Sequence, residues 1–367
     1  MKMSPDSKIS RRQFFFILVQ TQIGVGILAL PYDLHLEAGQ DGWISLILSG
    51  IFIQFVILTI WLTLEAFPGC DLFQIFTKMF GKWIGNLFNL IYYLYFVAVS
   101  ALILMLFGRM IHLWILPNTP FWLLASLLAV TCIYLISSGL VVMARIYTFV
   151  SFLLVIMLCL TLYIIPDIQL VYLLPIGEAS IPQIGKGAHT AMIAMLGFIS
   201  LFIVYPHVEG TSRQKLKSAS LANAFVTSFY LFITLMAFSY FSTAEIELVP
   251  QPVMFLLKSI EFYLIGRVDL FLISMWIVSV ATSFSTYFYM ASRGLSVIFQ
   301  TNEFDRCMYF TVFLPLILSL TIGIEEITID RYSVMIKWLA TLLSVCVPFV
   351  MTLISLIFFR RHRRKEA

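Results

Sequence analysis

The stretch TQIGVGILALPYD (residues 21–33) lies inside the first long apolar segment of the chain. A segment of this length predicts a membrane-spanning helix, but Gly24, Gly26 and Pro31 are residues that weaken or end helices. Lipid offers no hydrogen-bond partners to backbone groups that such a break would free. We therefore expect the break to line a cavity or meet a ligand, although glycine also serves close helix packing in membranes.

The composition is that of a membrane protein. Of 367 residues, 61% are hydrophobic and 11% are charged, and the mean hydropathy is +0.98, whereas soluble domains carry about 25% charged residues. We predict one integral membrane domain over 1–367, without a soluble catalytic module. The five cysteines are scattered and lack metal-ligand spacing, so we expect no metal site, no cofactor and no disulfide framework.

A window of about 19 residues predicts ten membrane-spanning helices. They cover 14–34, 43–65, 84–107, 121–137, 146–165, 188–206, 220–241, 268–291, 307–324 and 335–359. Ten spans place both termini on one side, and 17 of the 23 Lys and Arg fall on that side, which the positive-inside rule assigns to the cytoplasm. The C-terminal run RRHRRK predicts contact with anionic lipid, and we expect no nucleic-acid binding.

A second Gly/Pro-containing segment opens the second half of the chain. The stretch AMIAMLGFISLFIVYPHVEG (residues 191–210) carries Gly197 and Pro206. Paired breaks at corresponding positions favour an inverted-repeat transporter fold, and repeats of five helices have opposite topology because five is odd. We predict an all-α polytopic 5+5 inverted repeat with helices 1 and 6 broken at mid-membrane. The first repeat is 1–165, and the second is 188–324 plus 335–359.

The two breaks also predict the chemistry of a binding site. The half-helix after Gly24 and Gly26 points its positive N-terminal end at the cavity, which suits a carboxylate. The half-helix that ends near Gly197 offers carbonyls, which suit an ammonium group. Together they favour a zwitterion such as an amino acid. The alternative is that these glycines serve helix packing alone.

Several motifs resemble one known family. They are GVGILALP (24–31), DGWI (41–44), GKWIG (81–85), NTP (118–120) and GRVDLFLISMW (266–276). In order and spacing they resemble the B subunit of bacterial endospore germinant receptors, a branch of the amino acid–polyamine–organocation transporter superfamily. The resemblance implies a nutrient sensor in the spore inner membrane. It implies a small germinant as ligand, often an amino acid, and partnership with an A subunit and a lipoprotein C subunit.

Two residues depart from the family pattern. Family members often carry Glu where this chain has Ile199, and Arg where it has Tyr32. The missing carboxylate at position 199 argues against a strongly cationic ligand. A small neutral amino acid such as alanine, valine or leucine is favoured instead, and a sugar or nucleoside is the alternative.

In the architecture that the resemblance implies, helices 3 and 8 wall the cavity opposite the broken helices. One face of helix 3 carries tyrosines, and one face of helix 8 carries a hydroxyl stripe. The predicted ligand-binding residues are Thr21, Gln22, Gly24, Gly26, Tyr92, Tyr95, Val99, Leu196, Gly197, Phe198, Ser200, Ser279, Thr282 and Ser283. With the resemblance in view, Val99, Leu196 and Thr282 are the leading pocket-facing side chains. Packing between helices is the alternative for the tyrosines and the hydroxyl stripe.

Two functions remain open on the sequence: a ligand-sensing receptor subunit, and a secondary amino-acid transporter of the same fold. No Asp, Glu, Lys or Arg lies near the middle of a predicted span, which argues against proton-coupled pumping. We expect no enzyme, because the chain shows no nucleophile–base or metal constellation. His207 and Glu209 are only two residues apart and would not share a helix face.

Overall fold

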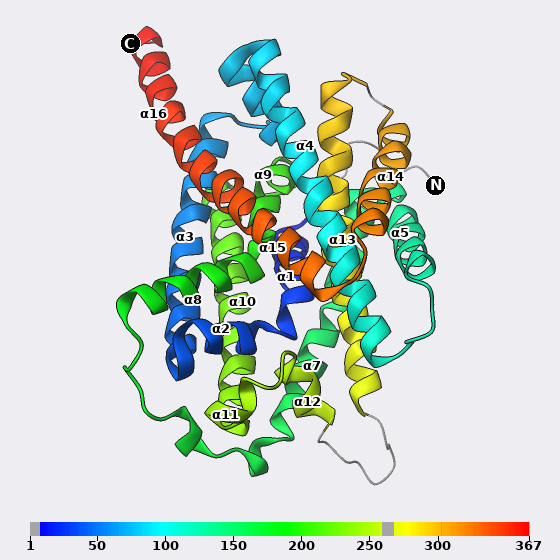
Figure 1. The fold of residues 1–367 in the computed structure, drawn as a ribbon. Helices are drawn as coiled ribbons and strands as arrows, with labels where there is room; N and C mark the ends of the chain where they lie inside the picture. The colour runs from blue at the N-terminus through cyan, green and yellow to red at the C-terminus, as the bar shows by residue number, and fades with distance from the viewer. Residues whose placement is uncertain (1–7, 259–267, 302, 367) are drawn as a thin grey trace.

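The computed structural model describes residues 8–258, 268–301 and 303–366 (Figure 1). Over these ranges the chain is all-helical, apart from turns and an isolated β-bridge between Ile9 and Val208. The α-helices are α1 (Arg11–Gln22), α2 (Leu30–Ala38), α3 (Gly42–Ala66), α4 (Leu72–Trp114), α5 (Phe121–Ser137), α6 (Leu140–Val150), α7 (Phe152–Leu162), α8 (Ile181–Ala194), α9 (Leu201–Val204), α10 (Ser212–Tyr240), α11 (Thr243–Ile246), α12 (Pro252–Lys258), α13 (Val268–Ile298), α14 (Phe304–Ile322), α15 (Glu326–Thr341) and α16 (Val347–Glu366). The first two residues of the GRVDLFLISMW motif (266–267) lie outside the described residues.

Within the described ranges, seven helical segments are long and apolar enough to cross a membrane. They are Leu30–Ala66, Leu72–Trp114, Leu140–Asp167, Ser212–Tyr240, Leu270–Ile298, Phe304–Ile322 and Glu326–Leu356. The bent pair Ile181–Ala194 and Leu196–His207 makes an eighth if it forms one span. Large apolar side chains such as Trp83, Leu127 and Phe149 point outward, as lipid contact requires. The chain is a multi-pass membrane protein, but length and composition do not confirm ten spans.

The difference from ten has two local causes. The predicted span 14–34 is divided between α1 and α2, and α1 alone has only 12 residues. The helix α2 then continues with α3 as a single apolar segment. The helix α5 coincides with the predicted span 121–137, but its 17 residues make it one of the shorter apolar helices.

The helix α4 is much longer than the predicted span 84–107. It begins at a capping box in which the Asp71 carboxylate accepts the N–H of Gln74, while the Gln74 side chain accepts the N–H of Asp71. Its backbone kinks at Gly81, whose φ of 79° lies in the left-handed region that glycine adopts without strain. An apolar window misses this first part because it carries the polar residues Lys78 and Lys82.

The long helices α4 and α13 pack against each other near the centre of the molecule, with α1 beside them (Figure 1). The Phe96 ring of α4 lies 6.3 Å from the Phe73 ring and 6.2 Å from the Tyr287 ring of α13, measured between centroids. The absence of a side chain at Gly294 leaves room for Phe73, since a Cβ there would lie 2.6 Å from that ring. Of this pair, α13 is the helix against which α1 packs.

The molecule has two distinct ends along its helices. In Figure 1, α9 and the C-terminal end of α16 lie at the upper end, and α11 and α12 lie at the lower end. The N–H of Ile9 donates to the carbonyl of His207 at 2.8 Å, and the N–H of Glu209 donates to the carbonyl of Ile9 at 2.9 Å, next to α9. We call the upper end, which holds these contacts and the end of α16, the terminal end, and the end with α11 and α12 the loop end.

Candidate functional site

The chain is unwound between α1 and α2. The helix α1 ends at Gln22 and α2 begins at Leu30, with a 3-10 turn over Val25–Ile27 between them. Pro31 lies in the first turn of α2, where its missing N–H would have had no helical partner. In the part of the chain that the structure describes, the first two residues of the 3-10 turn donate no main-chain hydrogen bond. Backbone donors are therefore free at this interruption.

A second interruption separates α8 from α9. Met195, with φ of −100° and ψ of 23°, leaves helical geometry, and the 3-10 segment Leu196–Ser200 follows. The two parts are bent by 52°. Gly197 in this segment lies so close to α1 that a Cβ would overlap the backbone of Thr21 and Gln22. The two interruptions therefore touch, and their contact requires glycine.

A cavity of about 510 Å³ lies between the two interruptions, α4 and α15. Of the ligand-binding residues predicted from the sequence, eight line this cavity: Thr21, Gln22, Gly24, Gly26, Val99, Leu196, Gly197 and Ser283. Apolar side chains such as Leu102, Ile193 and Ile336 complete the wall. A concave, mostly apolar space with a few polar groups is the usual form of a small-molecule site.

Six predicted residues lie outside the cavity lining. They are Tyr92, Tyr95, Phe198, Ser200, Ser279 and Thr282. The Tyr92 hydroxyl donates to the carbonyl of Leu343 at 2.6 Å, and the Tyr95 hydroxyl lies 3.1 Å from Ser344 Oγ, both in the π-helical turn between α15 and α16. Phe198 and Ser200 are buried in the 3-10 segment that follows α8. In this structure the two tyrosines connect helices.

The hydroxyl stripe of α13 covers the end of α1. The Ser283 hydroxyl lies 3.0 Å from the carbonyl oxygen of Gln20 and 3.2 Å from that of Thr21. The Thr282 hydroxyl donates to the side-chain oxygen of Gln20 at 2.9 Å. Ser279 makes a long contact of 3.5 Å within its own helix. Helix–helix contact accounts for Thr282, whereas Ser283 both covers α1 and lines the cavity.

Charged side chains line the cavity toward the loop end, and the sequence reasoning missed them. Arg109 of α4 and Glu326 of α15 form an ion pair of 2.7 Å, with side chains 20% and 66% exposed. Asp33, Asp330 and Lys337 also line the cavity. They lie at or between the ends of the predicted spans and are not among the predicted site residues. The sequence does contain a signal for a polar helix face here. The polar lining residues of α15 recur at i, i+4, i+7 and i+11, which places them on one face of the helix.

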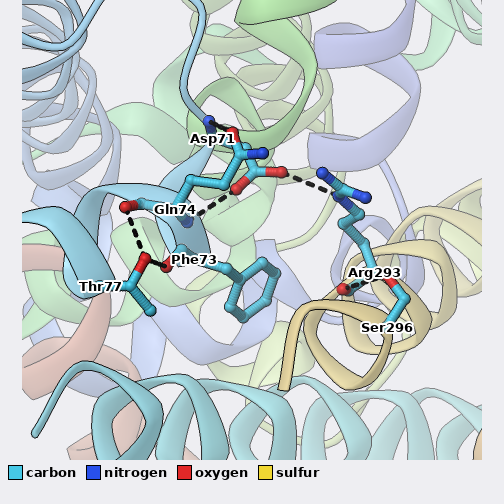
Figure 2. Close-up of polar contacts among 6 residues, drawn as sticks. All are labelled: Asp71, Phe73, Gln74, Thr77, Arg293 and Ser296. Carbon is cyan, nitrogen blue, oxygen red and sulfur yellow. Dashed lines mark hydrogen bonds and ion pairs between the residues drawn. The ribbon is translucent and has the colours of Figure 1, made fainter. Parts of the chain in front are cut away.

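An ion pair joins α4 to α13 at the terminal end. The carboxylate of Asp71, at the start of α4, accepts from Arg293 Nε of α13 at 2.8 Å and from the N–H of Gln74 at 3.0 Å (Figure 2). The Asp71 side chain is 3% exposed and the Arg293 side chain 31% exposed. Because Pro250 and Gln251, directly before α12, line the cavity and Pro250 is exposed, the cavity opens toward the loop end.

No group of three or more His, Cys, Asp or Glu residues in the described ranges could hold a metal ion. The five cysteines are free. His189 Nε2 lies 2.7 Å from the Thr341 hydroxyl, which is a contact between α8 and α15.

The family model described as "Spore germination protein" matches residues 8–327. The chain belongs to this family. This chain is 28% identical over 296 residues to spore germination protein GerQB of Bacillus cereus. The match covers 80% of this chain and 82% of the relative. It is 24% identical over 353 residues to spore germination protein B2 of Bacillus subtilis (strain 168), covering 95% of this chain and 96% of the relative. The resemblance seen in the sequence motifs is confirmed.

Solved transporter structures share the fold of this germination protein. MhsT in complex with L-phenylalanine aligns with a TM-score of 0.71 at 13% identity, covering 95% of this chain and 89% of that one. A Na+-coupled sialic acid symporter aligns with a TM-score of 0.63 at 12% identity, covering 92% and 79%. At these identities the likeness shows the fold alone, which this chain shares with these solved structures. Germination proteins and transporters are not enzymes, and neither is this chain.

Proposed function

We propose that this germination protein is the germinant-sensing subunit of a spore germination receptor. Its ligand is a small neutral amino acid, bound in the cavity between the α1–α2 and α8–α9 interruptions. The observation that carries this proposal is the cavity wall itself, where Gly26 and Gly197 bring two unwound backbone segments to one space. Family membership supplies the germination context.

The cavity wall offers the two kinds of group that a zwitterion needs. The unpaired N–H groups at Val25 and Gly26, together with the N-terminal end of α2, suit a carboxylate. The negative C-terminal end of α1 at Gln22 lies on the same wall and suits an ammonium group. The apolar side chains of the wall leave room for a short aliphatic side chain. Position 199 carries no carboxylate, but the side chain of Asp33 lines the cavity toward the loop end.

The proposed architecture is ten spans in a 5+5 inverted repeat, with both termini in the cytoplasm and the protein in the spore inner membrane. Ligand binding would shift the bundle that contains α1 and α8 against the α4–α13 pair. A ligand can do this only through a difference in affinity for the two arrangements. The shift would be passed to A-type and C-type receptor subunits, for which the homology to germination proteins is the support.

A secondary amino-acid transporter is the second candidate, because the structural neighbours named above are transporters. Counterflow of labelled L-alanine, L-valine and L-leucine in proteoliposomes separates the two. The sensor predicts binding without exchange. Saturable exchange by the isolated chain would assign it to transport.

The direct test is germination of a spore strain that carries this protein as its only germinant-sensing subunit, exposed to single nutrients. We expect a response to a small neutral amino acid, and no response from the Gly26→Ala variant. A Cβ at Gly26 meets the Ala194 Cβ at 3.1 Å, so the fold can adjust while the cavity wall changes. Gly185→Ala is the matched control, because nothing lies within 4 Å of its added Cβ. An unchanged response from Gly26→Ala would mean that the glycine serves packing alone.

A further inference from the structure

The side-chain amide of Gln22 is incompletely paired inside the protein. Gln22 is the last residue of α1, is 2% exposed and lines the cavity. Its Nε2 donates to the carbonyl of Leu18 at 3.2 Å. Its Oε1 has no hydrogen-bond partner among the described residues. A buried acceptor without a partner is destabilising, so such a group in a native structure calls for an explanation.

The orientation of this amide follows from chemistry. The carbonyl oxygen of Leu18 can only accept, so the amide nitrogen of Gln22 must face it and the amide oxygen must face away. The terminal torsion of glutamine is soft, so a small rotation that keeps the Leu18 contact can turn Oε1 further toward the cavity without a change in the backbone. An open acceptor is therefore available at the wall of the cavity.

The main-chain carbonyls at this end of α1 are already used. Those of Gln20 and Thr21 accept from the Ser283 hydroxyl at 3.0 and 3.2 Å, and that of Gln22 accepts from the Tyr230 hydroxyl at 3.2 Å. The carbonyl of Val19 accepts from a backbone N–H at 2.9 Å. The Gln22 side-chain oxygen is thus the acceptor at this end of α1 that has no partner at all in the described part of the chain.

Gln20 provides an internal comparison on the same helix. It is equally buried at 1% exposure, but both ends of its amide are paired. Its Nε2 donates to Ser151 Oγ at 3.0 Å, and its Oε1 accepts from the Thr282 hydroxyl at 2.9 Å. Gln20 is not part of the cavity lining. The two glutamines therefore differ in role: one joins helices and the other is open to the cavity.

We propose that Gln22 Oε1 accepts a hydrogen bond from the ammonium group of the ligand, and that Gln22 selects ligands that carry an amine. This inference rests on the proposed amino-acid ligand and adds the residue that reads its amine. The position next to the negative end of α1 favours a cationic donor. The neighbouring free N–H groups at Val25 and Gly26 would hold the carboxylate of the same molecule.

The test compares matched ligands on the full-length protein in membrane vesicles. The probes are L-alanine, L-valine and L-leucine, each paired with the acid that lacks only the amino group: propionate, 3-methylbutanoate and 4-methylpentanoate. The readout is the affinity for the amino acid divided by the affinity for the matching acid, in each pair. In Gln22→Met we expect this ratio to fall about tenfold or more, because a hydrogen bond to a charged group is lost. The affinity for the acid should change less than about threefold.

Two further variants separate selectivity from stability. Gln22→Glu keeps an acceptor of the same shape and adds a charge, so the ratio should rise above that of the wild type. Gln20→Met should lower thermal stability and leave the ratio unchanged. An unchanged ratio in Gln22→Met with wild-type binding intact would overturn the role of Gln22 and leave the proposed function standing. Failure of the wild type to bind any of the three amino acids would overturn the proposed ligand class itself.

Discussion

At Gly197 the two interrupted segments meet with no space for a side chain. An added Cβ would overlap the backbone of Thr21 and Gln22, and backbone atoms cannot move aside as a flexible side chain can. We expect Gly197→Ala to destabilise the protein by about 1–3 kcal/mol, as overpacking usually does. The measurement is the midpoint of thermal unfolding of the purified protein in detergent.

Gly185→Ala gives the control for Gly197. Gly185 lies in α8 with nothing within 4 Å of an added Cβ, so alanine there should be neutral or stabilise the helix by up to about 1 kcal/mol. Equal midpoints for the two variants would contradict the close contact between the interruptions.

Residue spacing identified which side chains share a helix face, but not which face turns to the cavity. Val99 and the two tyrosines before it share one face of α4, yet only Val99 lines the cavity, because Tyr92 and Tyr95 reach the π-helical turn after α15. That turn is irregular and has no simple periodic signature. Conversely, Lys337 is not among the predicted site residues, although it lies on α15 and lines the cavity.

Among the elements, α4 and α13 are joined at the terminal end by the Asp71–Arg293 pair (Figure 2). We expect Asp71→Asn to lower the free energy of unfolding by about 1–3 kcal/mol, because it leaves the arginine without its counter-charge in a mostly buried site. Asparagine is a good N-cap, so the start of α4 should survive and the effect should report the ion pair. The comparison of Asp71→Asn, Arg293→Gln and the double variant by thermal unfolding measures the coupling between the two residues.

An exposed ion pair in the same protein serves as the reference. Arg306 and Glu303 are three residues apart, with side chains 82% and 53% exposed. Glu303→Gln should change stability by no more than about 1 kcal/mol, since exposed pairs contribute little. A cost for Asp71→Asn no larger than this would show that the α4–α13 contact does not depend on the charge pair.

At the level of elements, apolar windows located the core of α3, α5 and α13 but not how the ends of α4 are built. The start of α4 is set by the Asp71–Gln74 capping box and a kink at Gly81, both in a polar stretch that a hydropathy window rejects. The Gly/Pro stretches marked where the backbone leaves helical geometry, near Gly26 and Gly197. Their contact in space depends on long-range packing that spacing along the chain does not encode.

For the whole molecule, the decisive property is the side of the membrane on which the cavity opens. The cavity opens toward the loop end, and the opposite end holds the Asp71–Arg293 pair and the Ile9–His207 contact. Under the proposed orientation, in which both termini are in the cytoplasm, this arrangement would face a nutrient that arrives from outside. The orientation depends on whether the bent pair α8–α9 crosses the membrane or turns back within it.

Cysteine labelling tests this crossing. In a background with the five native cysteines replaced by alanine, Lys186→Cys places a thiol near the start of the bent pair, in α8, and Arg213→Cys places one after its end, in α10, both at exposed positions. We expect a membrane-impermeant maleimide to label Lys186→Cys in intact cells, and to label Arg213→Cys only after permeabilisation. Labelling of both thiols from outside would make the bent pair a re-entrant segment, which would remove one crossing and exclude the 5+5 inverted repeat. Labelling of Arg213→Cys alone would invert the orientation, and the cavity would then open toward the cytoplasm.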